Sequence, residues 1–169
     1  VLGYTAAYFL AKYSAIKIFV LLFIQPMWVN FLIRTLATKA IFVSMNIPLG
    51  MGTVVFGMVY NYLPFMILPL HTVLSSIDKN YIEAAEDLGA DKFQVFAKTI
   101  LPLSVPGILS GITMVFIPTI STFAISQLLS DSTVFLFGDS IQMKFDQGLF
   151  GVGSVMSLVM IFLELISNF

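Results

Sequence analysis

Few side chains in this 169-residue sequence could catalyse a reaction, and none has a companion at catalytic spacing. His71 is the only histidine, there is no cysteine, and no other ligand type accompanies His71 at metal-site spacing. Ser154 follows Gly-Val-Gly, which does not match the GxSG setting of an intramembrane serine protease. No glycine-rich loop leads into Lys and Ser or Thr, so any nucleotide must be hydrolysed by another chain. The sequence therefore predicts no enzyme, no metal site and no cofactor.

The charged residues are concentrated between Asp78 and Pro102, a stretch called here the charged island. It holds eight of the seventeen Asp, Glu, Lys and Arg residues, whereas residues 40–77 and 99–130 contain none. Placing eight ionised side chains in lipid would cost on the order of 20 kcal/mol, at ~2.5 to 3.5 kcal/mol each. We therefore expect the charged island to lie in water, between two membrane-spanning segments.

The charged island has the pattern of two short helices joined by a glycine. Asp78 is a good N-cap for the first helix, and Gly89 supplies the left-handed residue that ends it. Asp91 with Gln94 three residues later indicates a capping box at the start of the second. One face of the first helix carries mostly small and apolar side chains, those of Tyr81, Ala84, Ala85 and Leu88. Such a ridge lets the backbone of a water-soluble partner approach closely.

The same stretch resembles a known signature. Glu83-Ala84-Ala85, then Gly89 four residues on, then Ile100-Leu101-Pro102 after ten intervening residues, resembles the EAA motif of ABC importer membrane subunits. In that family the loop forms coupling helices that dock into a groove on a cytoplasmic ATPase. The resemblance implies a coupling loop whose contact residues are Tyr81, Glu83, Ala84, Ala85, Leu88, Gly89, Ile100 and Pro102. The alternative is an ordinary solvated loop helix that contains the same letters.

The rest of the chain has the composition of a polytopic, all-α membrane protein. Apolar residues make up 59% and mean hydropathy is +0.99, against ~45–50% apolar in globular domains. Because a spanning helix needs about 20 residues, residues 2–10 are expected to be the end of a truncated helix. Both ends lie in apolar runs, so we interpret the chain as a fragment with about five transmembrane helices. The further spans are expected at residues 18–33, 53–74, 103–129 and 149–166.

Prolines and glycines indicate how these spans pack. Pro64 and Pro69 in one span predict an interior position, because neighbouring groups must satisfy the carbonyls that proline leaves unpaired. Gly107 and Gly111 form a GxxxG pair, which predicts close helix crossing rather than a site. Residues 44–52 are expected to be an irregular connection. Residues 130–147 are expected to be an extramembrane loop with a short amphipathic helix through Phe137, Ile141 and Phe145.

Cation bias gives a weak orientation. If the charged island is cytoplasmic, alternation places five cations inside and three outside. The inner set is Lys12, Lys17, Lys79, Lys92 and Lys98, and the outer set is Arg34, Lys39 and Lys144. This distribution agrees with the family resemblance, which implies the bacterial inner membrane with the charged island in the cytoplasm.

Residues 26–35, 63–70 and 141–145 extend the resemblance to type I permeases of spermidine/putrescine ABC importers. The resemblance implies one type-1 permease domain over residues 1–169, with the coupling loop at 78–102. The connection around 44–52 is shorter than that family leads us to expect. The implied partners are a cytoplasmic ATPase dimer, a second homologous permease, an extracytoplasmic polyamine-binding protein and the lipid bilayer, with no nucleic acid.

A polyamine crossing the membrane needs acceptors and aromatic faces, because an uncompensated ammonium in hydrocarbon is costly. The candidates for such a path are Trp28, Asn30, Tyr60, Asn61, Tyr62, Thr119 and Thr122. Carboxylates are few: Asp131 and Asp139 are expected outside the membrane, and Glu164 near the inner end of the last helix. We therefore predict a polar, transient passage. In the alternative interpretation, the aromatic side chains lie at the membrane interface or pack in the core, and the asparagines form helix–helix hydrogen bonds.

Two other classes of transport protein remain. A secondary transporter would need intramembrane acids or broken-helix ion sites, and the charge-free spans argue against it. A channel would need ring-forming carboxylates or a filter segment, and the sequence shows neither. Within the ABC importers, a permease for another small cation or organic solute stays open, because a coupling loop indicates the energy source and not the cargo.

Overall fold

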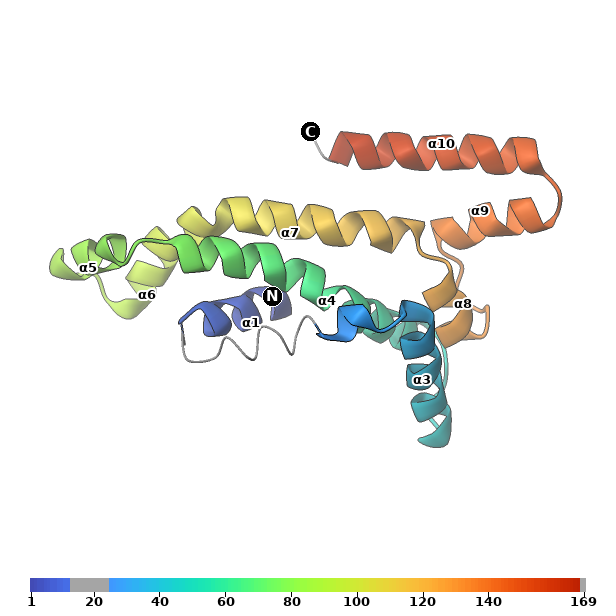
Figure 1. The fold of residues 1–169 in the computed structure, drawn as a ribbon, viewed down its shortest axis with the longest axis horizontal. Helices are drawn as coiled ribbons and strands as arrows, with labels where there is room; N and C mark the ends of the chain where they lie inside the picture. Colours follow the sequence, from blue (N-terminus) through green and yellow to red (C-terminus); the bar gives the residue numbers. More distant parts are fainter. Residues whose placement is uncertain (13–24, 168–169) are drawn as a thin grey trace. The chain divides into compact units, whose positions relative to one another are not determined.

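A computed structural model describes residues 1–12 and 25–167 of the chain. The described residues form helices joined by short turns, without a strand, which confirms the all-α prediction (Figure 1). Within residues 1–12 and 25–167, three helices are long and apolar enough to cross a membrane: Met51–Ser76, Lys92–Ser121 and Phe150–Ser167. The first and last of these match the predicted spans at 53–74 and 149–166 to within two residues.

The chain divides into two compact units, which are described separately. Unit 1 comprises Val1–Gln25 and Leu63–Met114, and unit 2 comprises Pro26–Tyr62 and Val115–Phe169. Helices α4 (Met51–Ser76) and α7 (Leu101–Ser121) contribute residues to both units.

Unit 1 is built around the second half of α4. Helix α1 (Leu2–Lys12), α5 (Lys79–Asp87), α6 (Lys92–Val95) and a π-helical segment η3 (Phe96–Ile100) complete it with the start of α7. The Tyr4 hydroxyl lies 3.0 Å from the Ser104 hydroxyl, and the Tyr8 ring meets the Phe96 ring edge-on at 5.5 Å. The core joins these elements through Ala7, Leu10, Ile67, Leu70, Leu74, Val95 and Ile100.

Helices α4 and α7 cross closely where α7 carries its glycine pair. A Cβ added at Gly107 would lie 3.0 Å from the Val73 Cβ and 3.3 Å from the Pro69 carbonyl oxygen. One added at Gly111 would lie 2.6 Å from the Met66 sulfur. The Gly111 contact is closer than real Cβ atoms come and the Gly107 contacts are tighter than most, so the close helix crossing predicted from the GxxxG pair is confirmed.

In unit 2, α3 (Phe31–Ser44) and the start of α4 pack against α8 (Ala124–Ser130), α8 contacts α9 (Phe137–Asp146), and α9 contacts α10 (Phe150–Ser167). The Thr53 hydroxyl donates to the Leu129 carbonyl at 2.7 Å, which ties α4 to α8. Helix α9 is the predicted amphipathic helix, and α10 folds back along it with Gly153 against the Phe145 ring (Figure 1). The core of the unit is Val54, Ile125 and Leu129.

Two predicted spans are broken, and these predictions were wrong. In the span expected at 18–33, the short 3-10 helix η2 (Gln25–Trp28) ends and Asn30 caps a new helix, α3. Residues 18–24 lie outside the described part.

The span expected at 103–129 ends at Ser121, and α8 is a separate helix. The chain turns at Thr122 and Phe123, and Gly138 of α9 packs against this turn: a Cβ on Gly138 would lie 2.5 Å from the Thr122 carbonyl oxygen. Only a glycine allows this approach. The turn is thus in contact with a residue well beyond the predicted span.

Candidate coupling surface and translocation residues

The first helix of the charged island begins and ends where the sequence predicts. The Asp78 carboxylate accepts from the Asn80 amide at 3.0 Å, which caps α5. At the other end Gly89 adopts φ +83°, and its amide donates to the Glu86 carbonyl at 2.8 Å. The Ala90 amide donates to the Ala85 carbonyl at 3.1 Å, completing a Schellman motif. The local fold of α5 is thus determined by residues at its two ends.

The second helix starts with the predicted capping box. The Gln94 amide donates to the Asp91 carboxylate at 2.7 Å, and the Asp91 amide donates to the Gln94 side chain at 3.4 Å. The helix then widens into η3, where the Leu101 amide donates to the Phe96 carbonyl. Pro102 accounts for this widening, because proline has no amide hydrogen and its ring crowds the carbonyl four residues back.

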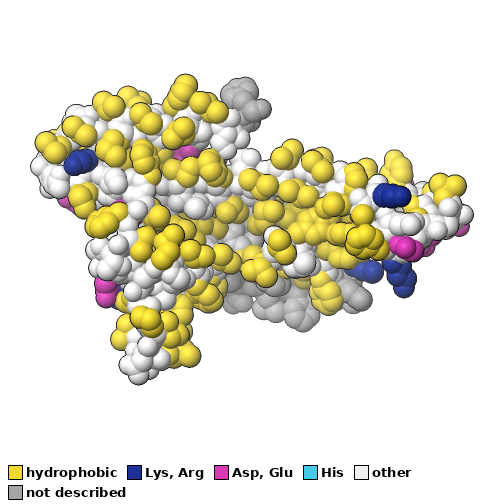
Figure 2. All heavy atoms as spheres, turned by 180° about the vertical axis from the view of Figure 1, so that it is seen from behind, with side chains coloured by type: hydrophobic (Ala, Val, Ile, Leu, Met, Phe, Trp, Pro, Cys, Tyr) yellow, Lys and Arg dark blue, Asp and Glu magenta, His cyan; other side chains and the backbone are white. Residues whose placement is uncertain are grey.

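Helix α5 buries none of its side chains fully and presents an exposed ridge. Tyr81 is 60% exposed and Leu88 is 89% exposed, with Ala84 exposed between them. Large apolar side chains seldom stay in water without a partner, so this ridge has the character of a contact surface. Figure 2 shows charged side chains gathered at the end of unit 1 that carries α5 and α6.

The structure separates the eight predicted coupling residues into two groups. Those on the surface are Tyr81, Glu83, Ala84, Leu88, Gly89 and Pro102. Ala85 is half-buried and packs with Ile82 against the core of unit 1, and Ile100 is 6% exposed within that core. Ala85 and Ile100 therefore hold the charged island in place, and the exposed residues are the ones a partner could touch.

Two of the predicted path residues, Tyr60 and Asn61, are in contact with Arg34, which the sequence predicts to lie in a polar flank. Arg34 Nε donates to the Asn61 side-chain oxygen at 2.9 Å, and Asn61 donates to the Gly57 carbonyl at 2.8 Å. The Arg34 guanidinium also lies over the Tyr60 ring, 5.2 Å from its centroid. A cation already sits on this aromatic face. The helix–helix hydrogen bond is therefore the role that the geometry gives Asn61.

Tyr62, Thr119 and Thr122 lie near one another around Pro118. The Tyr62 hydroxyl and the Thr122 amide both donate to the Pro118 carbonyl, each at 3.1 Å. The Thr119 hydroxyl donates to the Val115 carbonyl at 2.7 Å. The structure thus brings Tyr62 and Thr122 together at Pro118, and Thr119 is the next residue along α7.

Trp28 is the last residue of η2, and Asn30 directly precedes α3. Trp28 is 87% exposed, and the Asn30 side chain caps α3 by accepting from the Leu32 amide at 2.9 Å. Asn30 thus has a structural role that its position just before an apolar helix signals in the sequence.

Asp139, which the sequence predicts to lie outside the membrane, is buried within the protein. It is 2% exposed, a burial that the sequence does not predict. One carboxylate oxygen accepts from the Ser126 hydroxyl and, at 2.8 Å, from the Leu136 amide. The other has no hydrogen-bond partner among the described residues. The Leu136-to-Asp139 spacing, which is typical of a helix start, is the sequence signal for the bond between Asp139 and the Leu136 amide. The described part of the chain holds no cluster of metal ligands.

The exposed ridge between two membrane-length helices invites comparison with known transport proteins. Residues 1–169 match the family model of binding-protein-dependent transport system inner membrane components. The chain belongs to this family. The family resemblance read from the charged island is thereby confirmed.

The chain is also similar in sequence to individual permeases of the family. The chain is 37% identical over 164 aligned residues to the spermidine/putrescine transport system permease protein PotB of Escherichia coli (strain K12), covering 86% of this chain and 60% of that protein. It is 36% identical to PotB of Haemophilus influenzae, covering 85% and 57%. It is 34% identical to a PotB homolog of Mycoplasma pneumoniae, covering 74% and 49%. The chain thus spans at most about 60% of the length of these relatives.

Proposed function

We propose that this chain is the transmembrane permease subunit of an ATP-driven ABC importer in the bacterial inner membrane. Its charged island faces the cytoplasm and couples the permease subunit to a separate ATPase dimer. The chain itself is non-catalytic. The observation that carries the proposal is the exposed Tyr81–Ala84–Leu88 ridge on α5, which is capped at both ends and flanked by helices of membrane length.

The way unit 1 holds α5 suits the transmission of force. Ile82 and Ala85 on the inner side of α5 pack against a core that contains Leu74 of α4 and Ile100 of η3. Because η3 runs directly into α7, a push on the ridge reaches both flanking helices instead of being absorbed by a flexible loop. Such contiguous packing is what carries conformational coupling in proteins.

The proposed assembly adds a second, homologous permease and an extracytoplasmic binding protein. The cargo we propose is a polyamine such as spermidine or putrescine, the compounds after which the related PotB proteins are named. A path for a polycation needs neutral acceptors, which the Tyr62, Thr119 and Thr122 group offers. Tyr60 and Asn61 suit it poorly, because the Arg34 guanidinium beside them repels a cation.

Crosslinking tests the coupling role directly in the complete importer complex. The chain has no cysteine, so Ala84→Cys creates one thiol on the ridge. We expect it to crosslink to the ATPase and to react with an impermeant thiol reagent from the cytoplasmic side alone. The matched control is Ser110→Cys, on the exposed side of α7 in the same unit. Labelling of Ala84→Cys from outside the cell would overturn the proposal.

Uptake measurements test the cargo separately from the coupling. We expect labelled spermidine uptake to be competed by putrescine and not by unrelated organic solutes. Glu83→Lys should abolish uptake while leaving the permease in the membrane, because it reverses a charge on the docking surface. Specific competition by a different solute would retain the importer and replace the cargo.

A further inference from the structure

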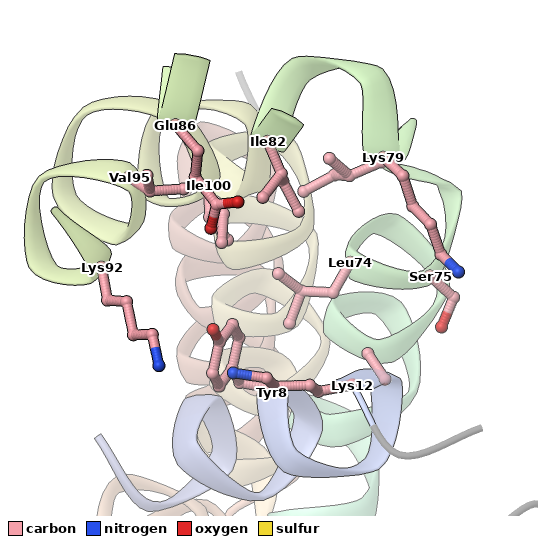
Figure 3. A pocket seen from close by; sticks show the side chains of 12 residues that line it. Tyr8, Lys12, Leu74, Ser75, Lys79, Ile82, Glu86, Lys92, Val95 and Ile100 are labelled. Atoms are coloured by element: carbon pink, nitrogen blue, oxygen red, sulfur yellow. The ribbon is translucent and has the colours of Figure 1, made fainter. Parts of the chain in front are cut away.

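Unit 1 contains a cavity of about 340 Å³ under the inner side of α5 (Figure 3). Its walls come from α1, the end of α4, α5 and α6 together with η3. The cavity therefore lies where the apolar helices meet the charged island. Its size is in the range of small-molecule sites.

The lining combines an apolar wall with a positive charge excess. Leu74, Ile82, Val95 and Ile100 supply apolar surface, and the charged lining residues are Lys12, Lys79 and Lys92 with a single carboxylate, Glu86. The formal charge of this lining is thus three positive against one negative. Among the described residues, no ion pair closer than 4.0 Å joins Glu86 to any of these lysines, so Glu86 neutralises none of them by direct contact.

The side chains are not evenly distributed around the cavity. Lys12 extends across the Tyr8 ring, with its ammonium 5.7 Å from the ring centroid, and Lys92 reaches toward the same side (Figure 3). Glu86 points into the cavity from above, whereas Lys79 extends on the opposite side beside Ser75 (Figure 3). Lys12 and Lys92 together with the Tyr8 hydroxyl are therefore the groups that a single anion could reach.

We propose that this cavity binds a phosphate group, and that the phosphate belongs to the headgroup of an anionic phospholipid in the cytoplasmic leaflet. The inference rests on the proposed function, which places the charged island on that side. Basic pockets at the cytoplasmic ends of membrane helices bind such headgroups. The apolar wall favours a lipid over a free anion, because it gives the acyl region of a bound lipid a surface to cover.

A lipid in this cavity would touch every element that supports the coupling ridge. Ile82 of α5 and Val95 of α6 line it from the island, and Leu74 lines it from α4. Its occupancy would therefore strengthen the connection between the ridge and the membrane helices. The site is a regulatory one, in which an anionic membrane favours the coupled form.

Native mass spectrometry of the complete importer complex tests the site without requiring transport. The complex is purified from nanodiscs of phosphatidylcholine with and without phosphatidylglycerol, and retained phosphatidylglycerol is counted. We expect the double variant Lys12→Gln, Lys92→Gln to lower phosphatidylglycerol affinity by about tenfold or more. Lys98→Gln is the matched control, because Lys98 is an exposed lysine of the same island outside the cavity.

The outcomes separate the possible occupants. Glycerol phosphate or inorganic phosphate that displaces the lipid at millimolar concentration would show a free-anion site and overturn the lipid assignment. Equal retention by the double variant and the Lys98→Gln control would overturn the site altogether. Both variants must keep the parent melting temperature in phosphatidylcholine, which excludes misfolding. Since the Ala84→Cys labelling is a separate readout, either proposal can fail while the other stands.

Discussion

The Arg34 guanidinium of α3 donates from both Nε and Nη2 to the side-chain oxygen of Asn61 on α4. This pairing connects an arginine expected in a polar flank to an asparagine expected on a cargo path. It consumes the hydrogen-bonding capacity of the Asn61 oxygen and brings a fixed cation beside Tyr60. The candidates that remain for the path of a polycation are accordingly the polar residues around Pro118.

Asn61→Leu should therefore affect stability more than cargo affinity. The substitution deprives Arg34 of an acceptor and the Gly57 carbonyl of a donor, which costs about 1–3 kcal/mol. Thermal unfolding in detergent should show the loss, while the spermidine concentration for half-maximal uptake stays within about twofold of the parent. Tyr62→Phe provides the contrast, and we expect it to change that concentration more than Asn61→Leu does.

Gly89→Ala should weaken the end of α5 through backbone strain alone. Gly89 has φ +83° with open space around the position of a Cβ, so the cost of about 1–2 kcal/mol comes from the left-handed conformation. We expect a lower melting temperature and weaker stimulation of the partner ATPase by cargo. Gly151→Ala is the control, because that glycine lies in α10 with equally open space and no positive φ. Equal effects of both changes would contradict the strain argument.

Gly107→Ala should loosen the crossing of α4 and α7. The added methyl group would meet the Val73 Cβ at 3.0 Å and the Pro69 carbonyl oxygen at 3.3 Å, neither of which is the end of a flexible side chain. Overpacking of this kind costs about 1–3 kcal/mol. Hydrogen exchange of the first turns of α7 should rise. Gly52→Ala, where nothing lies within 4 Å of the new atom, should leave that exchange unchanged.

Asp139→Ala should destabilise the α8–α9 corner of unit 2. It removes the acceptor for the buried Ser126 hydroxyl and for the Leu136 amide, a loss of about 1–3 kcal/mol. Asp139→Asn should cost less, because its amide oxygen can still accept from Leu136. Asp131→Ala is the comparison, since its ion pair with Lys39 is largely exposed and such pairs contribute about 0–1 kcal/mol. The ranking of the three melting temperatures is the measurement.

The amino-acid sequence alone determined the helical class, two of the membrane-length helices and the construction of the charged island. These features depend on interactions over short distances in the chain: Asp78 with Asn80, Asp91 with Gln94, and Gly89 with the turn before it. Caps and turns of this kind act within a few residues, so the pattern of residue types is sufficient to predict them.

Tertiary structure decided which of the polar residues are exposed to a partner and which form hydrogen bonds within the fold. Arg34 contacts Asn61 27 positions away, Thr53 contacts Leu129 76 positions away, and Gly138 of a later helix packs against the turn that follows α7. Periodicity places a residue on a helix face, but it does not specify which other helix covers that face. For this reason Asp139 became a buried residue, Ala85 turned toward the core and Tyr81 stayed in the open, all outcomes of long-range packing.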